Sequence, residues 1–337
     1  MLAPAFALAL GLSLALTPLA VRIAWATGYL DHPEARKLHT AATALLGGAA
    51  VFVSALLAWL IALRLGGRPI EPAGPRVPLL VAGAAIALAW GMWDDRRGMG
   101  VPLKLAGQVL ASACVVAAGA LPDLGLPAPV EALLTVFALV ALLNAVNFLD
   151  NMNGMIAGFA AIGLAGFAWH SAQRGALGIA AAQLALAGGC AGFLPWNFPR
   201  ARIFLGDAGS LLLGYSLGAS AVLAFAGTPA GWGRIGTLFV LAYPAFDLLF
   251  VVVRRLREGR KIQQGGKDHS NHRLARLLRC PTRTVILLWL SGAALSASGL
   301  VVLSLNRPGP TLLWSGLWTL LFLAMGLRLS SVPSDPR

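Results

Sequence analysis

Long apolar segments dominate this chain and restrict the folds that it can adopt. They lie near residues 2–25, 45–66, 78–93, 102–120, 128–148, 154–173, 176–195, 209–227, 233–253, 283–304 and 310–329. A transmembrane helix needs about 20 apolar residues. Only 12% of the 337 residues are charged, whereas soluble domains carry about 25%. The sequence therefore predicts an all-α, polytopic integral membrane protein with about eleven transmembrane helices.

The distribution of lysine and arginine predicts the orientation of these helices. Six of the 26 basic residues fall in one set of alternating loops, and the others fall in the second set. Loops rich in Lys and Arg stay in the cytoplasm, so we expect the N-terminus outside and the C-terminus inside. This topology predicts one transmembrane domain over 1–329 and a cytoplasmic tail over 330–337. The expected cytoplasmic loops are 26–44, 94–101, 148–153, 196–208 and 254–282.

The excess of positive charge also bears on partners. In a soluble chain a formal charge of +13 would suggest nucleic acid. Here the rule that positive loops stay inside accounts for it, so we expect membrane lipid around the chain and no nucleic-acid partner. The three cysteines are scattered and predict neither a disulfide framework nor a metal site.

Polar residues cluster between Asn144 and Gly154, in the stretch Asn-Ala-Val-Asn-Phe-Leu-Asp-Asn-Met-Asn-Gly. The nearest basic residues in the sequence are Lys104 and Arg174, so Asp150 has no local cation. An acid beside the hydrocarbon is expected to have a function. At helical spacing the asparagines form one polar face that ends at Asp150. An ordinary helix end followed by a turn is the alternative.

Adjacent carboxylates, Asp94 and Asp95, end another apolar run on the same expected side of the membrane. Two such groups repel each other unless a cation lies beside them. That cation could be a divalent metal, a lysine bound to phosphate, or the arginines Arg96 and Arg97 that follow. Lys104 lies about one turn into the next run, where a cation is costly, which favours a functional site.

A third acid, Asp207, opens an apolar run between Gly206 and Gly209. Glycine allows a ligand to approach the backbone closely, and the N–H groups of a new helix point toward such a ligand. The alternative is that Asp207 serves only as the N-cap of this helix.

Two basic loops contain candidates for phosphate binding. Arg36, Lys37 and His39 could bind phosphate or could simply set the topology. His269 and His272 are three residues apart, a spacing that suits metal binding, phosphate binding or acid–base chemistry. Histidines on a basic loop are otherwise unremarkable.

Together these segments resemble the polyprenyl-phosphate N-acetylhexosamine-1-phosphate transferases, whose motifs occur here in family order along nearly the whole chain. The matching residues are Asp31, Pro33, Arg36, Lys37, His39, Gly47, Gly48, Asp94, Asp95, Lys104, Gln108, Asn144, Asn147, Phe148, Asp150, Gly206, Asp207, Gly209, Ser210, His269 and His272. Three features depart from the family. Asn153 replaces a usual aspartate, Asn271 replaces a usual histidine, and the prolines usual before Gly47 are missing.

The resemblance implies an enzyme that transfers a sugar-1-phosphate from a UDP-N-acetylhexosamine to a polyprenyl phosphate such as undecaprenyl phosphate. UMP is released, and lipid-linked glycan synthesis begins. The late histidine segment and the eleventh span are more similar to the N-acetylglucosamine-1-phosphate branch than to the phospho-MurNAc-pentapeptide branch. The resemblance also implies Mg²⁺, or Mn²⁺ in its place, an active site facing the cytoplasm at the inner (plasma) membrane, and a homodimer.

The same resemblance assigns roles to individual residues. It makes Asp207 the primary metal ligand, joined by Asp150. The other expected roles are catalysis by Asp94, Asp95, Asp150, His269 and His272, phosphate binding by Arg36, Lys37, His39 and Lys104, and a nucleotide-sugar pocket with Asn144, Asn147 and Asn153. A phosphate monoester has a second pKa of about 6, so the lipid phosphate is mostly dianionic at neutral pH. Direct in-line attack is therefore favoured, although the sequence leaves open whether Asp94 acts as base or nucleophile.

Two other classes of protein share part of the pattern. A transporter also carries acids within the membrane, but here the costly charges apart from Asp247 gather at one face of the membrane, and Asp247 could be structural. A scaffold that binds anionic lipid through residues 254–283 would explain the arginines of that loop. It would not explain Asp150 or Asp207.

Overall fold

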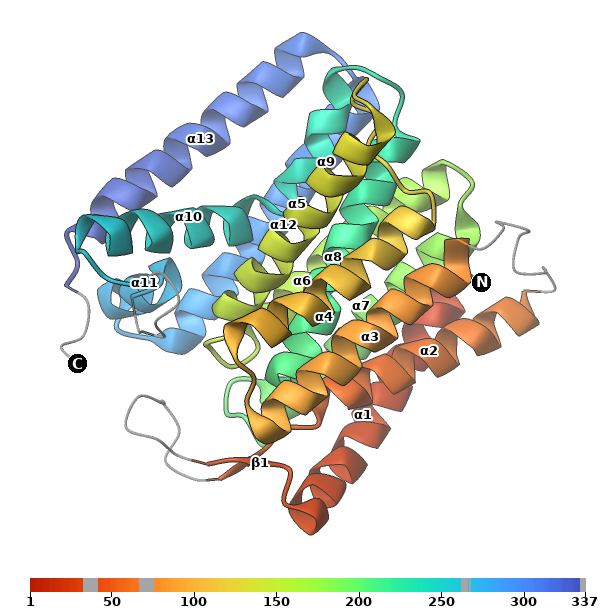
Figure 1. The fold of residues 1–337 in the computed structure, drawn as a ribbon, viewed down its shortest axis with the longest axis vertical. Coiled ribbons are helices and arrows are strands. Elements are labelled where there is room, and N and C mark those ends of the chain that lie inside the picture. The colour runs from red at the N-terminus through yellow and green to blue at the C-terminus, as the bar shows by residue number, and fades with distance from the viewer. Residues whose placement is uncertain (33–41, 67–75, 262–265, 267, 334–337) are drawn as a thin grey trace. The chain divides into compact units, whose positions relative to one another are not determined.

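The structure is a computed structural model that describes residues 1–32, 42–66, 76–261, 266 and 268–333. The chain forms two compact units, Met1–Gly227 and Thr228–Arg337, and each is described by itself. In both units most of the described residues are helical (Figure 1).

The described residues of the first unit form eight helices and one short antiparallel strand pair. The helices are α1 (Leu2–Thr27), α2 (Gly47–Leu65), α3 (Arg76–Arg97), α4 (Val101–Ala117), α5 (Ala128–Leu149), α6 (Met155–Gln173), α7 (Leu177–Asn197) and α8 (Gly206–Gly227). The strands are β1 (Leu30–Asp31) and β2 (Thr43–Ala44).

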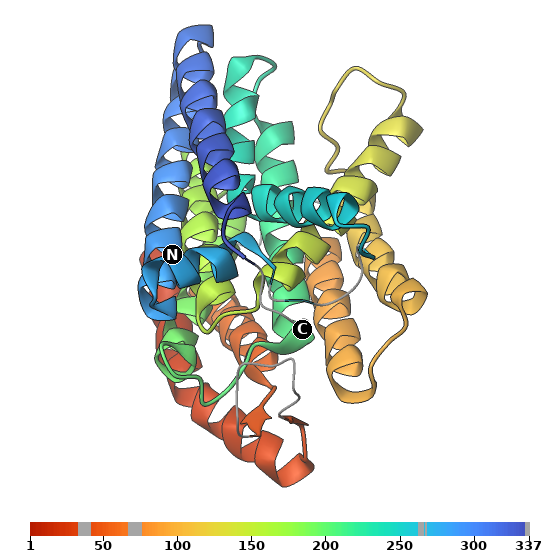
Figure 2. The same ribbon diagram turned by 90° about the vertical axis from the view of Figure 1, so that its left-hand side faces the viewer.

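In the second unit, the part of the chain that the structure describes forms a short 3-10 helix and five α-helices. They are η1 (Trp232–Ile235), α9 (Gly236–Phe239), α10 (Ala242–Arg257), α11 (Ser270–Leu278), α12 (Pro281–Leu305) and α13 (Pro308–Ser330). Figure 2 shows α10 lying crosswise to the long helices α12 and α13. Phe250 and Val251 of α10 pack against Leu329 near the end of α13, which anchors this crossing.

The predicted all-α, polytopic architecture is confirmed, because the apolar runs are helical. Within the described residues, nine helices are long and apolar enough to cross a membrane. The run predicted at 233–253 is divided, since η1–α9 and α10 meet at a bend of 69°. Pro244 lies in the first turn of α10 and has no N–H for the carbonyl of residue 240, so one helical hydrogen bond is missing next to this bend. The run predicted at 102–120 forms the 17-residue α4, which is shorter than the other candidate spans.

Helix α8 forms the centre of the first unit and is buried along most of its length. Glycines let two neighbouring helices approach its first turn. A Cβ atom on Gly48 of α2 would lie 2.4 Å from the nitrogen of Gly209, and one on Gly91 of α3 would lie 2.5 Å from the nitrogen of Ala208. Any larger residue would push α8 away. The start of α8 is therefore fixed against α2 and against the end of α3.

Backbone pairing also fixes the loop that precedes α8. Phe204 N donates a hydrogen bond to Ala44 O at 2.8 Å, and the nitrogens of Gly47 and Gly48 donate to Phe204 O and Leu205 O at 3.1 Å each. These bonds satisfy the first N–H groups of α2, which have no partner within their own helix. As a result, the loop before α8 and the start of α2 hold each other in place.

Candidate active site

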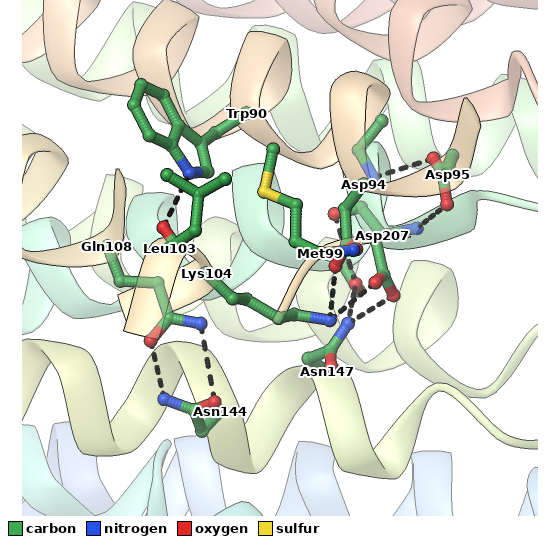
Figure 3. A network of polar contacts seen from close by, with 12 residues as sticks. Trp90, Asp94, Asp95, Met99, Leu103, Lys104, Gln108, Asn144, Asn147 and Asp207 are labelled. Carbon is green, nitrogen blue, oxygen red and sulfur yellow. Dashed lines mark hydrogen bonds and ion pairs between the residues drawn. The ribbon is translucent and has the colours of Figure 1, made fainter. Parts of the chain in front are cut away.

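A lysine and two aspartates from three helices meet at one end of the first unit. Lys104 Nζ of α4 lies 2.7 Å from Asp94 Oδ2 of α3 and 2.5 Å from Asp207 Oδ2 of α8 (Figure 3). The side chain of Asp94 is 9% exposed, whereas that of Asp207 is 32% exposed. One ammonium thus partly neutralises two acids, and Asp207 presents the more accessible oxygen atoms.

Asp95 faces a different partner from its neighbour. Its Oδ1 accepts a hydrogen bond from the backbone nitrogen of Asp207 at 2.7 Å, and its Oδ2 accepts one from that of Ala208 at 3.1 Å (Figure 3). Asp95 therefore caps the N-terminus of α8 from another helix, where a carboxylate also interacts favourably with the helix dipole. The alternative in which Asp207 serves only as N-cap is wrong, since its side chain binds Lys104.

Gly206 makes this cap sterically possible. Its φ angle is +70°, and a Cβ atom there would lie 2.5 Å from Asp95 Oδ2. Both observations require glycine, because other residues rarely adopt a positive φ and any side chain would collide with the carboxylate. The adjacent aspartates therefore avoid mutual repulsion by pointing at different positive groups, the Lys104 ammonium and the start of α8.

The asparagines of α5 lie one turn apart but have different partners. Asn147 Nδ2 donates to Asp207 Oδ1 at 2.7 Å and to Ser210 Oγ at 2.8 Å. Asn144 exchanges hydrogen bonds with Gln108 of α4, at 2.6 Å from Asn144 Nδ2 and 3.3 Å from Gln108 Nε2 (Figure 3). Of the two, Asn147 contacts Asp207 directly, whereas Asn144 joins α5 to α4.

Asp150 follows the last residue of α5 and is partly buried. Burial and, to a lesser extent, the negative charge of Asp207 raise the pKa of Asp150 to about 7. The two carboxylates therefore lie close enough to repel each other. Asn153 lies farther along the same loop, where its Nδ2 donates to Pro199 O at 3.0 Å and so joins this loop to the one before α8.

Asp207 and Asp150 offer the ligand atoms that a magnesium ion prefers. Mg²⁺ typically binds one or two carboxylates and completes its shell with substrate phosphate and water. Among the described residues, no group of three or more His, Cys, Asp or Glu side chains is arranged to hold a metal. A pair of carboxylates is nevertheless enough for Mg²⁺, and a bound dication would offset the burial and the charge of Asp207, which together raise the pKa of Asp150. The residues present therefore fit this ion.

The predicted phosphate-binding residues Arg36, Lys37 and His39 lie outside the described residues. The segment just before them is placed beside the end of α3. Tyr29 donates a hydrogen bond to Met92 O, and the Arg96 guanidinium lies 5.8 Å from the centre of the Tyr29 ring. The first loop therefore leaves the helices next to Asp94 and Asp95.

His269 and His272 belong to the second unit, where both are buried. Their ring centres are 6.3 Å apart. His269 Nδ1 lies 2.8 Å from Asp247 Oδ2, so this acid inside a predicted span is paired with a histidine. The structure thus gives His269 a partner 22 residues earlier in the chain.

A second buried cluster precedes the histidines. Asp268 accepts hydrogen bonds from Arg255 Nε at 2.9 Å and from an Arg255 terminal nitrogen at 2.8 Å, and it accepts a third from Arg260 at 3.0 Å. Burial alone would raise the pKa of this carboxyl, but the two arginines outweigh burial and lower it to about 2. This ion pair fixes the chain immediately before His269.

Sequence reasoning missed three pairings. It proposed Asp95 for catalysis and found no role as a cap, it gave Gln108 no partner, and it considered Asp247 only as a structural acid. The cost of an acid inside a membrane helix was a signal for Asp247. No comparable signal exists for the cap, because Asp95 and the nitrogen of Asp207 are 112 residues apart in the chain.

Comparisons with known proteins point to one family. The family model described as "Glycosyl transferase family 4" matches residues 77–225, which include all the acids of the first unit described above. The chain is 32% identical over 330 residues to a decaprenyl-phosphate N-acetylglucosaminephosphotransferase of Mycolicibacterium smegmatis, covering 86% of this chain and 79% of the relative. It is 28% identical over 334 residues to a probable undecaprenyl-phosphate N-acetylglucosaminyl 1-phosphate transferase of Bacillus subtilis, covering 96% and 90%.

A more distant relative extends the comparison. The chain is 25% identical over 303 residues to an undecaprenyl-phosphate alpha-N-acetylglucosaminyl 1-phosphate transferase of Yersinia pestis, covering 86% of this chain and 81% of the relative. The family match and the extent of these similarities show that the chain belongs to glycosyl transferase family 4, the polyprenyl-phosphate N-acetylhexosamine-1-phosphate transferases.

Proposed function

We propose that this protein transfers N-acetylglucosamine-1-phosphate from UDP-N-acetylglucosamine to a polyprenyl phosphate and releases UMP. The relatives described above are named for N-acetylglucosamine and for decaprenyl or undecaprenyl phosphate, which supports this choice of substrates. The product would be a polyprenyl diphosphate carrying one sugar, the first intermediate of a lipid-linked glycan.

The observation that carries the proposal is the placement of Lys104 between Asp94 and Asp207. Both substrates bring phosphate to the membrane surface, so a site for them needs a cation that can move between protein carboxylates and substrate oxygens. Lys104 is such a cation, since its ammonium has three donors and sits on a flexible stem. Its side chain is 23% exposed, so an entering phosphate can reach it.

The reaction is a phosphoryl transfer. An oxygen of the lipid phosphate attacks the phosphorus that bears the sugar, a new P–O bond forms, and the bond to the oxygen of UMP breaks. The lipid phosphate is already mostly dianionic at neutral pH, since its second pKa is about 6, so no base is required. Catalysis then depends on alignment of the two phosphates and on neutralisation of their charge.

Residues of the first unit have distinct parts in this scheme. Asp94 accepts hydrogen bonds from the Lys104 ammonium and from the Met99 backbone nitrogen at 2.7 Å, so we assign it the role of positioning Lys104. Asn147 holds Asp207 through a 2.7 Å hydrogen bond. Asp95 fixes the backbone of Asp207 and Ala208. The side chain of Asp207 is therefore oriented from both sides.

Asp207 and Asp150 would hold Mg²⁺, or Mn²⁺ in its place. When bound, this ion would neutralise charge on the substrate diphosphate and orient it for in-line displacement. The basic loop with Arg36, Lys37 and His39 and the histidines His269 and His272 would supply further contacts to phosphate. We place the site at the cytoplasmic face of the inner membrane, because loops with excess Lys and Arg stay inside.

The test is UMP release by purified protein in liposomes that contain undecaprenyl phosphate. We expect release with UDP-N-acetylglucosamine and Mg²⁺, and none without the lipid phosphate or with EDTA. A panel that includes UDP-N-acetylgalactosamine and UDP-MurNAc-pentapeptide identifies the sugar. Preference for the pentapeptide donor would move the protein to the peptidoglycan branch. Solute flux without UMP release with any donor would favour the transporter alternative.

A further inference from the structure

Asp247 is a buried carboxylate with a specific set of donors. It lies in α10 and is 1% exposed. Its Oδ1 accepts hydrogen bonds from the Ser270 backbone nitrogen at 2.8 Å and from Ser270 Oγ at 2.6 Å. Its Oδ2 lies 2.8 Å from His269 Nδ1. The two oxygens thus have different partners. Oδ1 binds Ser270 at the start of α11, and Oδ2 faces His269.

The contact with Asp247 Oδ2 determines which ring nitrogen of His269 carries a hydrogen. A carboxylate with three close partners is held as the anion, and an anion can only accept hydrogen bonds. Nδ1 of His269 must therefore carry a hydrogen. In the neutral ring the lone pair is then on Nε2, and in the charged ring Nε2 carries the second hydrogen. Either form presents Nε2 as the nitrogen for proton transfer or for binding phosphate.

We propose that Asp247 is a positioning residue that fixes the tautomer and the ring orientation of His269. The claim about the tautomer stands on the geometry of the second unit alone, and the claim about catalysis rests on the proposed function. A buried carboxylate is costly, and a role that needs a carboxylate oxygen at one defined position explains why it is there.

The other ionisable groups around His269 leave this pairing intact. Asp268, the neighbouring acid, already binds Arg255 and Arg260 and is not available as a competing acceptor for Nδ1. The hydroxyl of Tyr243 in α10 lies 3.1 Å from Ser270 Oγ, on the Oδ1 side of the carboxylate. His272 of α11 lies edge-on to the His269 ring at 6.3 Å between centres. Asp247 is therefore the carboxylate that contacts Nδ1.

Asp247→Asn is a sharp test because it changes one atom of this arrangement. Its remaining oxygen can still accept both hydrogen bonds from Ser270, whereas the new NH₂ group would face Nδ1 as a donor. Nδ1 would then have to accept, and the hydrogen would move to Nε2. Tyr243→Phe is the matched control, because it removes a hydroxyl on the Oδ1 side and leaves the Oδ2 contact unchanged.

The direct measurement is ¹⁵N NMR of histidine-labelled full-length protein in detergent micelles. The chain has five histidines, so a His269→Gln spectrum identifies the signal. We expect hydrogen on Nδ1 in the wild type and in Tyr243→Phe, and hydrogen on Nε2 in Asp247→Asn. Hydrogen on Nε2 in the wild type, or the same tautomer in all three proteins, would overturn the assignment. This measurement needs no substrate, so it decides the tautomer even if the proposed function fails.

Kinetics test whether Asp247 acts through His269. We expect Asp247→Asn to lower kcat for UMP release on the order of 10²-fold, within the range for a positioned acid or base, with little change in KM for the sugar nucleotide. The double variant Asp247→Asn/His269→Ala should be no slower than His269→Ala. Independent, multiplied losses, or a loss matched by Tyr243→Phe, would show that Asp247 serves only the packing of α10 on α11.

Discussion

Asp95 binds Asp207 through the backbone, because Asp95 Oδ1 accepts the hydrogen of the Asp207 nitrogen at 2.7 Å. The acid that ends α3 therefore builds the first turn of α8, and it leaves the side chain of Asp207 for Lys104 and Asn147. Two neighbouring aspartates thus have different roles. Asp94 binds the Lys104 ammonium, and Asp95 caps the N-terminus of α8.

This cap predicts that Asp95→Ala destabilises the protein. Loss of an N-cap side chain costs about 0.5–2 kcal/mol, so the thermal unfolding midpoint in detergent should fall by a few degrees. Asp95→Asn keeps one acceptor oxygen and should lie between alanine and the wild type. An unchanged midpoint in Asp95→Ala would show that α8 does not depend on this contact.

Asp207→Asn should abolish UMP release while leaving the fold intact. The amide loses the charge that attracts both Lys104 and a divalent ion, but the backbone nitrogen still binds Asp95. We therefore expect an unfolding midpoint near that of the wild type and no turnover at any Mg²⁺ concentration. Substantial Mg²⁺-dependent turnover in this variant would contradict the assignment of Asp207 as metal ligand.

Asp94→Asn should retain measurable activity. Direct attack by the lipid phosphate needs no base, so the loss reflects weaker positioning of Lys104, on the order of 10- to 100-fold in kcat. The residual rate should be easiest to detect at high pH, where the lipid phosphate is fully dianionic. Rapid quenching with labelled donor provides the counter-test, because a phosphorylated Asp94 in the wild type would replace direct attack with a covalent mechanism.

The pKa of about 7 at Asp150 predicts a pH dependence of metal binding. Below this pH the carboxyl is protonated and cannot bind an ion, and above it the carboxylate is free to do so. The apparent affinity for Mg²⁺ should therefore rise from pH 6 to pH 8 and then level off. Titrations of UMP release with Mg²⁺ at several pH values measure this slope. Asp150→Asn should bind more weakly and lack the slope, and the same slope in that variant would assign it to another group.

Asp268 predicts how the second unit responds to acid. Its pKa is lowered to about 2 in the folded protein, below the value of about 3.9 in an unfolded chain. The stability that it contributes is therefore fully present above about pH 4 and is lost as the pH falls through about 2. At neutral pH, Asp268→Asn leaves Arg255 buried without its charge partner, which typically costs about 3–5 kcal/mol. Unfolding midpoints between pH 7 and pH 2.5 should fall in the wild type and change less in the variant.

The fold could largely be predicted from the sequence, because hydropathy alone determines which segments can lie in a bilayer. The start of α8 is an instructive error, since the apolar run was placed at 209 and the helix begins at Gly206. Asp207 lies in that polar first turn, and a hydropathy profile does not identify a polar turn as part of a helix. The bend before α10 was also missed, because a hydropathy profile does not show where an apolar run changes direction.

For the candidate site, the sequence suggested residues but not their pairings. Charges at a membrane face are costly, so Asp94, Lys104 and Asp207 could be identified without a structure. Which group each one contacts depends on the packing of α3, α4 and α8, and Asp207 follows Lys104 by 103 residues. The sequence also contained no sign that Asn144 would bond to Gln108, because an amide side chain can pair with many partners.

The bridge through Lys104 also has a consequence for how the chain is made. Asp94 and Lys104 are ten residues apart on consecutive helices, so they can neutralise each other as soon as α3 and α4 have left the ribosome. Asp207 emerges much later and joins a pair that already exists. A nascent chain without Lys104 would insert the Asp94 carboxylate into the membrane without this cation, and the later arrival of Asp207 would add a second negative charge.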